Sequence, residues 1–353
     1  MNRTLKRISS NSAAYRVYYP LLYKTLFRSS ATQYVFFSDS SCQLKIPYFQ
    51  QGFANAEVTD TAPSTSKISQ GLDFIFKLLY LKPYTSTMDV ITKKLGSAGL
   101  KLGPLVVWVD SEATVSKLVD ALDGLKKGPA SIYIDLEGVN LSRHGTISIM
   151  QIYDAVDKCV YLVDIHTFGA KCFSTPGKDG RTLKHVLEDE NIIKVFFDVR
   201  NDSDALYAHY NIELAGIHDL QLMEVATRNY NRRLLNGLAK CIDRDAPLTE
   251  RERENMLDVK AKGRKLFLPE QGGSYEVFNQ RPLPDSLKLY CVHDVQVLPR
   301  LYDHYDKKMS EAWRQKVLDV SVERVTMSHR ADYVTSGRFM VFAPASWLYE
   351  NEV

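Results

Sequence analysis

Hydrophobic and polar positions follow regular periods from about residue 104 onward. Short apolar runs such as PLVVWVD, CVYLVD and KVFFDV are typical of strands. Stretches such as DSEATVSKLVDALDGL and LKHVLEDE instead repeat apolar residues at helical spacing. The pattern predicts strands at 104–110, 131–138, 145–153, 159–164 and 194–199, and helices at 110–125, 183–190, 201–211, 219–230, 236–242 and 285–308. Strands that alternate with helices indicate an α/β fold with a mixed sheet.

Three segments of different character divide the chain. Residues 1–103 are expected to be an N-terminal extension, basic at its start and partly disordered, with a small, polar linker at 54–70. Residues 104–310 carry the periodic pattern and are expected to form the main domain. Residues 311–353 are expected to form a C-terminal helix followed by a short tail.

Two carboxylates stand two residues apart in the stretch SIYIDLEG. A strand with period two places Asp135 and Glu137 on one face, with Ile134 and Leu136 on the other. Neighbouring carboxylates raise each other's pKa and resist joint ionisation unless a cation lies between them. From this stretch alone, a divalent metal site and an exposed strand end with two solvated acids are equally good interpretations.

Further acids lie at two later positions. Asp198, Asp202 and Asp204 crowd the junction between a buried strand and a helix, the kind of place where open α/β sheets form their sites. Tyr290 and Asp294 are four residues apart, so a helix would point both toward one surface. Taken singly, such residues often cap a helix or hydrogen-bond to each other, and their order along the chain is the stronger signal.

Composition excludes several classes of protein. The chain has 353 residues, of which 45% are hydrophobic, and its longest apolar runs fall well short of the roughly 20 residues that cross a bilayer. Five scattered cysteines without CxxC spacing predict neither a disulfide framework nor a zinc site. No membrane partner is expected, and an intracellular location follows. The basic, acid-poor start is compatible with a transit peptide or a basic tail, so nucleus, cytoplasm and mitochondrion stay open.

The ordered motifs YIDLEG, FFDVRNDSDAL and YCVHDVQVLPRLY, supported by GTISIMQI and RPLP, make the chain resemble a known family. It is similar to the DEDDy group of 3′-5′ exonucleases in the ribonuclease D superfamily, over roughly residues 104 to 306. The resemblance implies a ribonuclease H-like mixed β-sheet flanked by helices. It also implies hydrolysis of phosphodiester bonds from the 3′ end of single-stranded nucleic acid, with RNA favoured over DNA.

The resemblance assigns roles to five side chains. Asp135, Glu137, Asp202 and Asp294 would be catalytic carboxylates that bind two divalent cations, Mg²⁺ or Mn²⁺. Four carboxylates suit two such cations roughly 3.5 to 4 Å apart, one activating water and one stabilising the leaving oxygen. Tyr290 would orient the attacking water, because the histidine variant of the superfamily needs His where Leu289 stands. Asp198 and Asp204 are expected to lie off the metals, in capping or solvated positions.

Substrate binding and activity leave alternatives open. The segment 243–280 is expected to be an insertion that covers the active site. A dense basic region, which also includes Lys260, is a candidate for nucleic-acid binding through Arg232, Arg233, Lys240, Lys262, Arg264 and Lys265. Acids interrupt it, so a solvated helix with ion pairs is an equal interpretation. Some relatives with similar motifs lack some of the acids and serve as RNA-binding adaptors. The alternative function is therefore an inactive or weakly active RNA-binding adaptor.

Overall fold

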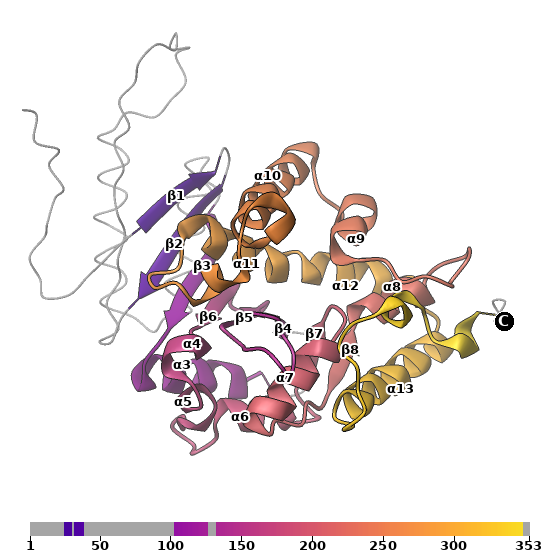
Figure 1. Cartoon of the computed structure of the whole chain (residues 1–353), viewed down its shortest axis with the longest axis horizontal. Coiled ribbons are helices and arrows are strands. Elements are labelled where there is room, and N and C mark those ends of the chain that lie inside the picture. Colours follow the sequence, from indigo (N-terminus) through magenta and orange to yellow (C-terminus); the bar gives the residue numbers. More distant parts are fainter. Residues whose placement is uncertain (1–24, 30–31, 39–101, 126–131, 349–353) are drawn as a thin grey trace, which may run out of the picture.

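A single sheet organises the fold (Figure 1). The computed structural model describes residues 25–29, 32–38, 102–125 and 132–348. The eight strands of the sheet have the order β1-β2-β3-β6-β5-β4-β7-β8. Their bounds are β1 Thr25–Ser29, β2 Thr32–Ser38, β3 Leu102–Val109, β4 Ile132–Glu137, β5 Ile149–Asp154, β6 Cys159–Val163, β7 Lys194–Phe196 and β8 Ile217–Asp219. The predicted linker at 54–70 lies outside the described residues.

Pairing within the sheet is mixed. Strands β4, β5 and β6 form an antiparallel meander, with Asp135 opposite Gln151 on β5. Strand β3 runs parallel to β6, while β7 runs parallel to both β4 and β8. The strands β3 to β7 correspond to the five predicted strands of the expected mixed sheet, whereas β8, β1 and β2 were not predicted.

Helices cover both faces of the sheet (Figure 1). The helices that precede β8 are α3 Glu112–Asp123, α4 Ile165–Phe168, α5 Lys171–Ser174, α6 Leu183–Glu188 and α7 Arg200–Tyr210. Those that follow β8 are α8 Leu220–Ala226, α9 Leu238–Asp245, α10 Glu250–Phe267, α11 Asp285–Gln296, α12 Leu298–Asp306 and α13 Glu311–Ser328. Two buried apolar clusters result, one with α3, α6 and α7 and the other with α8 to α13. Among the described residues, no helix has the length and apolar character to cross a membrane.

The helix predicted at 285–308 departs from the sequence pattern. Residues 285–308 were expected to form one helix, but the structure breaks it at Val297 into α11 and α12. Pro299, within the first turn of α12, explains the break, because proline lacks an N–H donor and its ring clashes with the preceding turn. The boundary at residue 310 stays a prediction. Helix α13 packs against β8, α7 and α8.

Candidate functional site: a carboxylate cluster between β4 and α11

Strand β4 presents two acids on one face of the sheet. Ile134 and Leu136 are buried in the cluster with α3, α6 and α7. Asp135 and Glu137 are half-buried, and β4 contacts α11. The alternation predicted from the sequence is confirmed, because side chains of a strand point to its two faces in turn. The acids therefore lie on the side of the sheet that α11 covers.

Helix α11 brings the third acid and the tyrosine. Tyr290 and Asp294 lie one turn apart, as their spacing predicts. Arg281, just before the helix, donates to both oxygens of Asp164 at 2.7 and 2.5 Å, and its guanidinium lies 5.5 Å from the ring centroid of Trp108. This anchor ties the start of α11 to the sheet, which gives the RPLP motif a structural role.

Three carboxylates meet where β4 and α11 touch. Oxygen atoms of Asp135, Glu137 and Asp294 all lie within 4.8 Å of one another. Burial, and then the charge of Asp294, raises the pKa of Asp135 to about 7. Burial, and then the charge of Asp135, raises the pKa of Glu137 well above its usual range. Hard oxygen donors crowded in this way fit a divalent cation such as Mg²⁺ or Mn²⁺, which would offset their repulsion.

Asp202 lies beside this cluster, outside the group of three. It is buried in the first turn of α7. Burial and the charge of Asp135 raise its pKa well above the usual range, and Asp202 in turn raises the pKa of Glu137. The structure therefore brings all four predicted acids into one electrostatic neighbourhood, three of them at ligand distance from one another.

The other two acids of the second motif form ion pairs. Asp204 is fully buried and accepts from the Arg143 Nε at 2.6 Å. Asp198 pairs with Arg200 at 2.5 Å and with Arg324 of α13 at 3.4 Å. The expectation that they lie off the metals agrees with these pairs. A solvated position was wrong for Asp204, and Asp198, whose side chain is 27% exposed, forms ion pairs instead of capping α7, whose N-cap is Val199. Guanidinium groups compensate both carboxylates: Arg200 and Arg324 are buried, and Arg143 is partly buried.

Tyr290 keeps its proton in this setting. Burial, followed by the negative charges of Asp294, Glu137 and Asp135, raises its pKa far above the usual range for a phenol. The hydroxyl is therefore a neutral hydrogen-bond donor at any physiological pH. It has the chemistry to orient a water molecule or a phosphate oxygen without ionising.

Lys260 belongs to the site, whereas the sequence had placed it in the dense basic region and not beside the carboxylates. It lies on α10, its Nζ pairs with Asp294, and it lies 5.1 Å from the centroid of the Tyr290 ring. The pair joins positions 34 residues apart, a separation that no local pattern reveals. Its helix comes from the segment 243–280, and this pair shows α10 reaching the carboxylate cluster.

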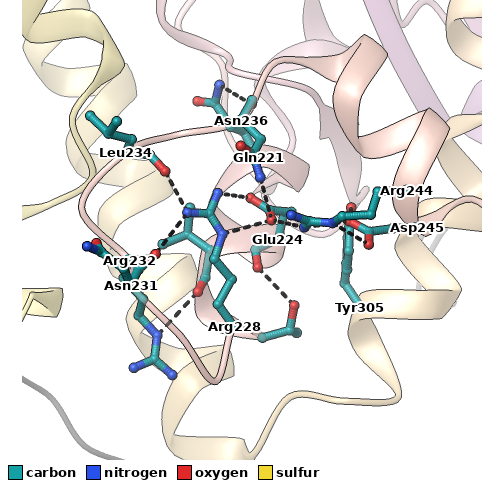
Figure 2. Close-up of polar contacts among 12 residues, drawn as sticks. Gln221, Glu224, Arg228, Asn231, Arg232, Leu234, Asn236, Arg244, Asp245 and Tyr305 are labelled. Carbon is teal, nitrogen blue, oxygen red and sulfur yellow. Dashed lines mark hydrogen bonds and ion pairs between the residues drawn. The ribbon is translucent and has the colours of Figure 1, made fainter.

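The predicted basic region divides into buried and exposed members. Arg232 is buried, stacks 4.7 Å from the ring centroid of Trp313 and donates to the Val225 carbonyl. Its burial beside a polar network (Figure 2) favours a packing role, and its assignment to nucleic-acid binding stays a prediction. The remaining members are exposed and stay candidates: Arg233, Lys240, Lys262, Arg264 and Lys265.

The raised pKa of Asp135 predicts a pH dependence of stability in the absence of metal. Between its usual value of 3.8 and about 7, the folded protein holds a proton that the unfolded chain has released. Asp135 therefore lowers the free energy of unfolding as pH rises through this window. In thermal melts with EDTA, the Asp135→Asn variant should gain stability over wild type as pH rises from about 5 to about 8. A difference in stability between Asp135→Asn and wild type that does not change with pH would contradict the raised pKa of Asp135.

Comparisons with known proteins agree with this geometry. A family model described as 3′-5′ exonuclease matches residues 106–310. The piRNA biogenesis protein EXD1 of Mus musculus is 29% identical over 191 residues, 52% of this chain and 31% of that protein. EXD1 of Homo sapiens is 29% identical over 181 residues, 50% of this chain and 32% of that protein. The chain thus matches about a third of the length of these relatives, 31% and 32%.

Solved structures show the same fold. Trypanosoma brucei RNase D in complex with RNA U12 has a TM-score of 0.55 and 20% identity, over 69% of this chain and 77% of that one. The GMP complex of the same enzyme has a TM-score of 0.54 and 22% identity, over 69% of this chain and 70% of that one. The predicted ribonuclease H-like fold of ribonuclease D is thereby confirmed. The family model matches more than half of this chain, so the chain belongs to the 3′-5′ exonuclease family.

Proposed function

We propose that the chain is a metal-dependent exonuclease that removes nucleotides from the 3′ end of single-stranded RNA. The observation that carries the proposal is the meeting of Asp135, Glu137 and Asp294 within 4.8 Å. Tyr290 lies one turn from Asp294 on the same helix. Membership of the exonuclease family supports a reaction in which such carboxylates hold divalent cations.

Each side chain has a role in this proposal. Asp135, Glu137 and Asp294, with Asp202 beside them, would hold the cations. Divalent cations bound there would supply a nucleophile at neutral pH and offset the charge that develops on the leaving oxygen. Tyr290, held neutral, donates a hydrogen bond that orients the attacking water. Exposed side chains on α10, Lys262, Arg264 and Lys265, are proposed to contact phosphates of the substrate.

RNA is the proposed substrate class for two reasons. The matched T. brucei RNase D was solved in complex with RNA U12, and the curated relatives are named for piRNA biogenesis. The RNase D likeness, at 20% identity, shows fold alone, and the EXD1 match covers 31% of the mouse protein. The choice of RNA is therefore a proposal for this chain. An adaptor that binds RNA without cutting it is the alternative that the test must separate.

The test is shortening of a single-stranded RNA labelled at its 5′ end, and of the matching DNA, with Mg²⁺ or Mn²⁺. We expect a ladder of products shortened from the 3′ end, faster on RNA, that disappears with EDTA. If folded protein leaves both strands intact with either metal but retains RNA in a binding assay, the adaptor function takes the place of the nuclease. Faster shortening of DNA would overturn the substrate class alone.

Tyr290→Phe should lower kcat by about 100-fold, because it removes the hydroxyl that orients the water while keeping the ring. Its melting temperature should stay close to that of wild type. Tyr302→Phe is the matched control, since it removes a partly buried hydroxyl that contacts His218 Nδ1 at 2.9 Å. Single-turnover kinetics on labelled RNA measure both. Equal activity of the two variants would exclude a role of Tyr290 in orienting water.

A further inference from the structure

Lys260 places an ammonium group among the carboxylates. Its side chain is only 12% exposed and its Nζ pairs with Asp294, which is 4% exposed. The same ammonium lowers the pKa of Asp135 and Glu137, although burial and the other acids outweigh it. Lys260 therefore faces the same three acids that would hold a cation.

Close packing between α10 and α11 holds Lys260 in this position. Gly263 lies three residues after Lys260, on the same face of α10. A Cβ atom at Gly263 would lie 2.6 to 2.8 Å from atoms of the Tyr290 side chain, so only glycine lets the helices approach this closely. Phe267, one turn later, packs with its ring centroid 5.2 Å from that of Tyr290. The contact is therefore built into the helix pair.

Other basic side chains of α10 have different surroundings. Lys262 is 64% exposed and pairs at 2.7 Å with Asp258, which is 55% exposed. Arg264 and Lys265 are also exposed. A pair between exposed groups contributes little, whereas a charge that is nearly excluded from water interacts strongly with its neighbours. Lys260 thus differs from its neighbours in burial as well as in partner.

We propose that Lys260 is a built-in counter-cation that competes with divalent metal for Asp294, so that helix α10 regulates how readily the site binds metal. The inference rests on the proposed function, because it takes the carboxylate cluster to be a metal site. Two cations that bind the same carboxylate compete, and each weakens the binding of the other by the same factor. Release of Asp294 by Lys260 then accompanies metal binding.

The experiment is calorimetric titration of the full chain with Mn²⁺ in the absence of nucleic acid. Lys260→Gln should bind Mn²⁺ about tenfold more tightly than wild type, within the usual range of coupling between two sites. Lys262→Gln removes the same charge from the same helix and should bind Mn²⁺ as wild type does. Circular dichroism confirms that each variant is folded.

A second variant keeps the lysine and moves its helix. Gly263→Ala should force α10 away from Tyr290, loosen the pair with Asp294 and tighten Mn²⁺ binding in the same direction. This result supports the proposal even if Lys260→Gln does not fold. Equal or weaker Mn²⁺ binding by folded Lys260→Gln relative to Lys262→Gln would overturn it and leave the metal site intact. If wild type and every variant fail to bind Mn²⁺, the proposed metal site is wrong as well.

Discussion

Replacing Asp135 by Asn is expected to abolish RNA shortening while making the metal-free protein more stable. Loss of one ligand of the carboxylate cluster should slow cleavage at least about 10³-fold, since charge stabilisation by bound cations contributes several kcal/mol. The same substitution removes a carboxylate whose pKa is raised to about 7 by burial and by Asp294. We therefore expect a gain in stability at pH 8 of about a few kcal/mol.

The opposite signs of these two effects separate a functional residue from a structural one. Activity is measured on 5′-labelled RNA with Mn²⁺, and stability by urea unfolding with EDTA. Asp319→Asn is the control, because Asp319 is exposed on α13 and accepts a hydrogen bond from Gln315 at 2.8 Å. It should change neither quantity. An Asp135→Asn variant that is destabilised and still active would refute the assignment of Asp135 to the metal site.

Replacing Glu224 by Ala is expected to destabilise the fold by about 3 to 5 kcal/mol, the range for breaking a buried ion pair on one side. Glu224 of α8 is 1% exposed and accepts two hydrogen bonds from Arg228, which is 4% exposed (Figure 2). It also accepts from Arg244 at 2.7 Å and from Asn236 at 3.0 Å. The variant would leave the Arg228 charge buried without its carboxylate.

Glu112→Ala is the control for this stability effect. Glu112 pairs with Lys171 at 3.2 Å, but the two side chains are 68% and 64% exposed, so the pair should contribute less than about 1 kcal/mol. Urea unfolding at pH 7 gives both values. Similar losses for the two variants would show that the network in Figure 2 adds nothing beyond a surface ion pair.

The local pattern of hydrophobic residues predicted most of the helices and strands. Its errors arise from a local proline and from contacts between positions far apart in the sequence. The strands β4 and β6 and the helices α3, α6 and α7 match the expected segments closely, while β5 begins four residues later than predicted. Pro299 divides the single helix expected at 285–308. The prediction gave the strong apolar period more weight than this proline. Arg232 was assigned to a basic surface, yet it packs on Trp313, 81 positions further along, whose proximity no local period reveals.

The sequence alone determined the identity and order of the acids, the face of β4 on which Asp135 and Glu137 lie, and the shared face of Tyr290 and Asp294. These features depend on the periods of a strand and a helix, which are local properties of the backbone. Only the tertiary structure decided that Lys260 pairs with Asp294, that Asp204 pairs with Arg143, and that Asp202 lies outside the group of three. Such contacts join distant positions, and they depend on how the helices pack on the sheet.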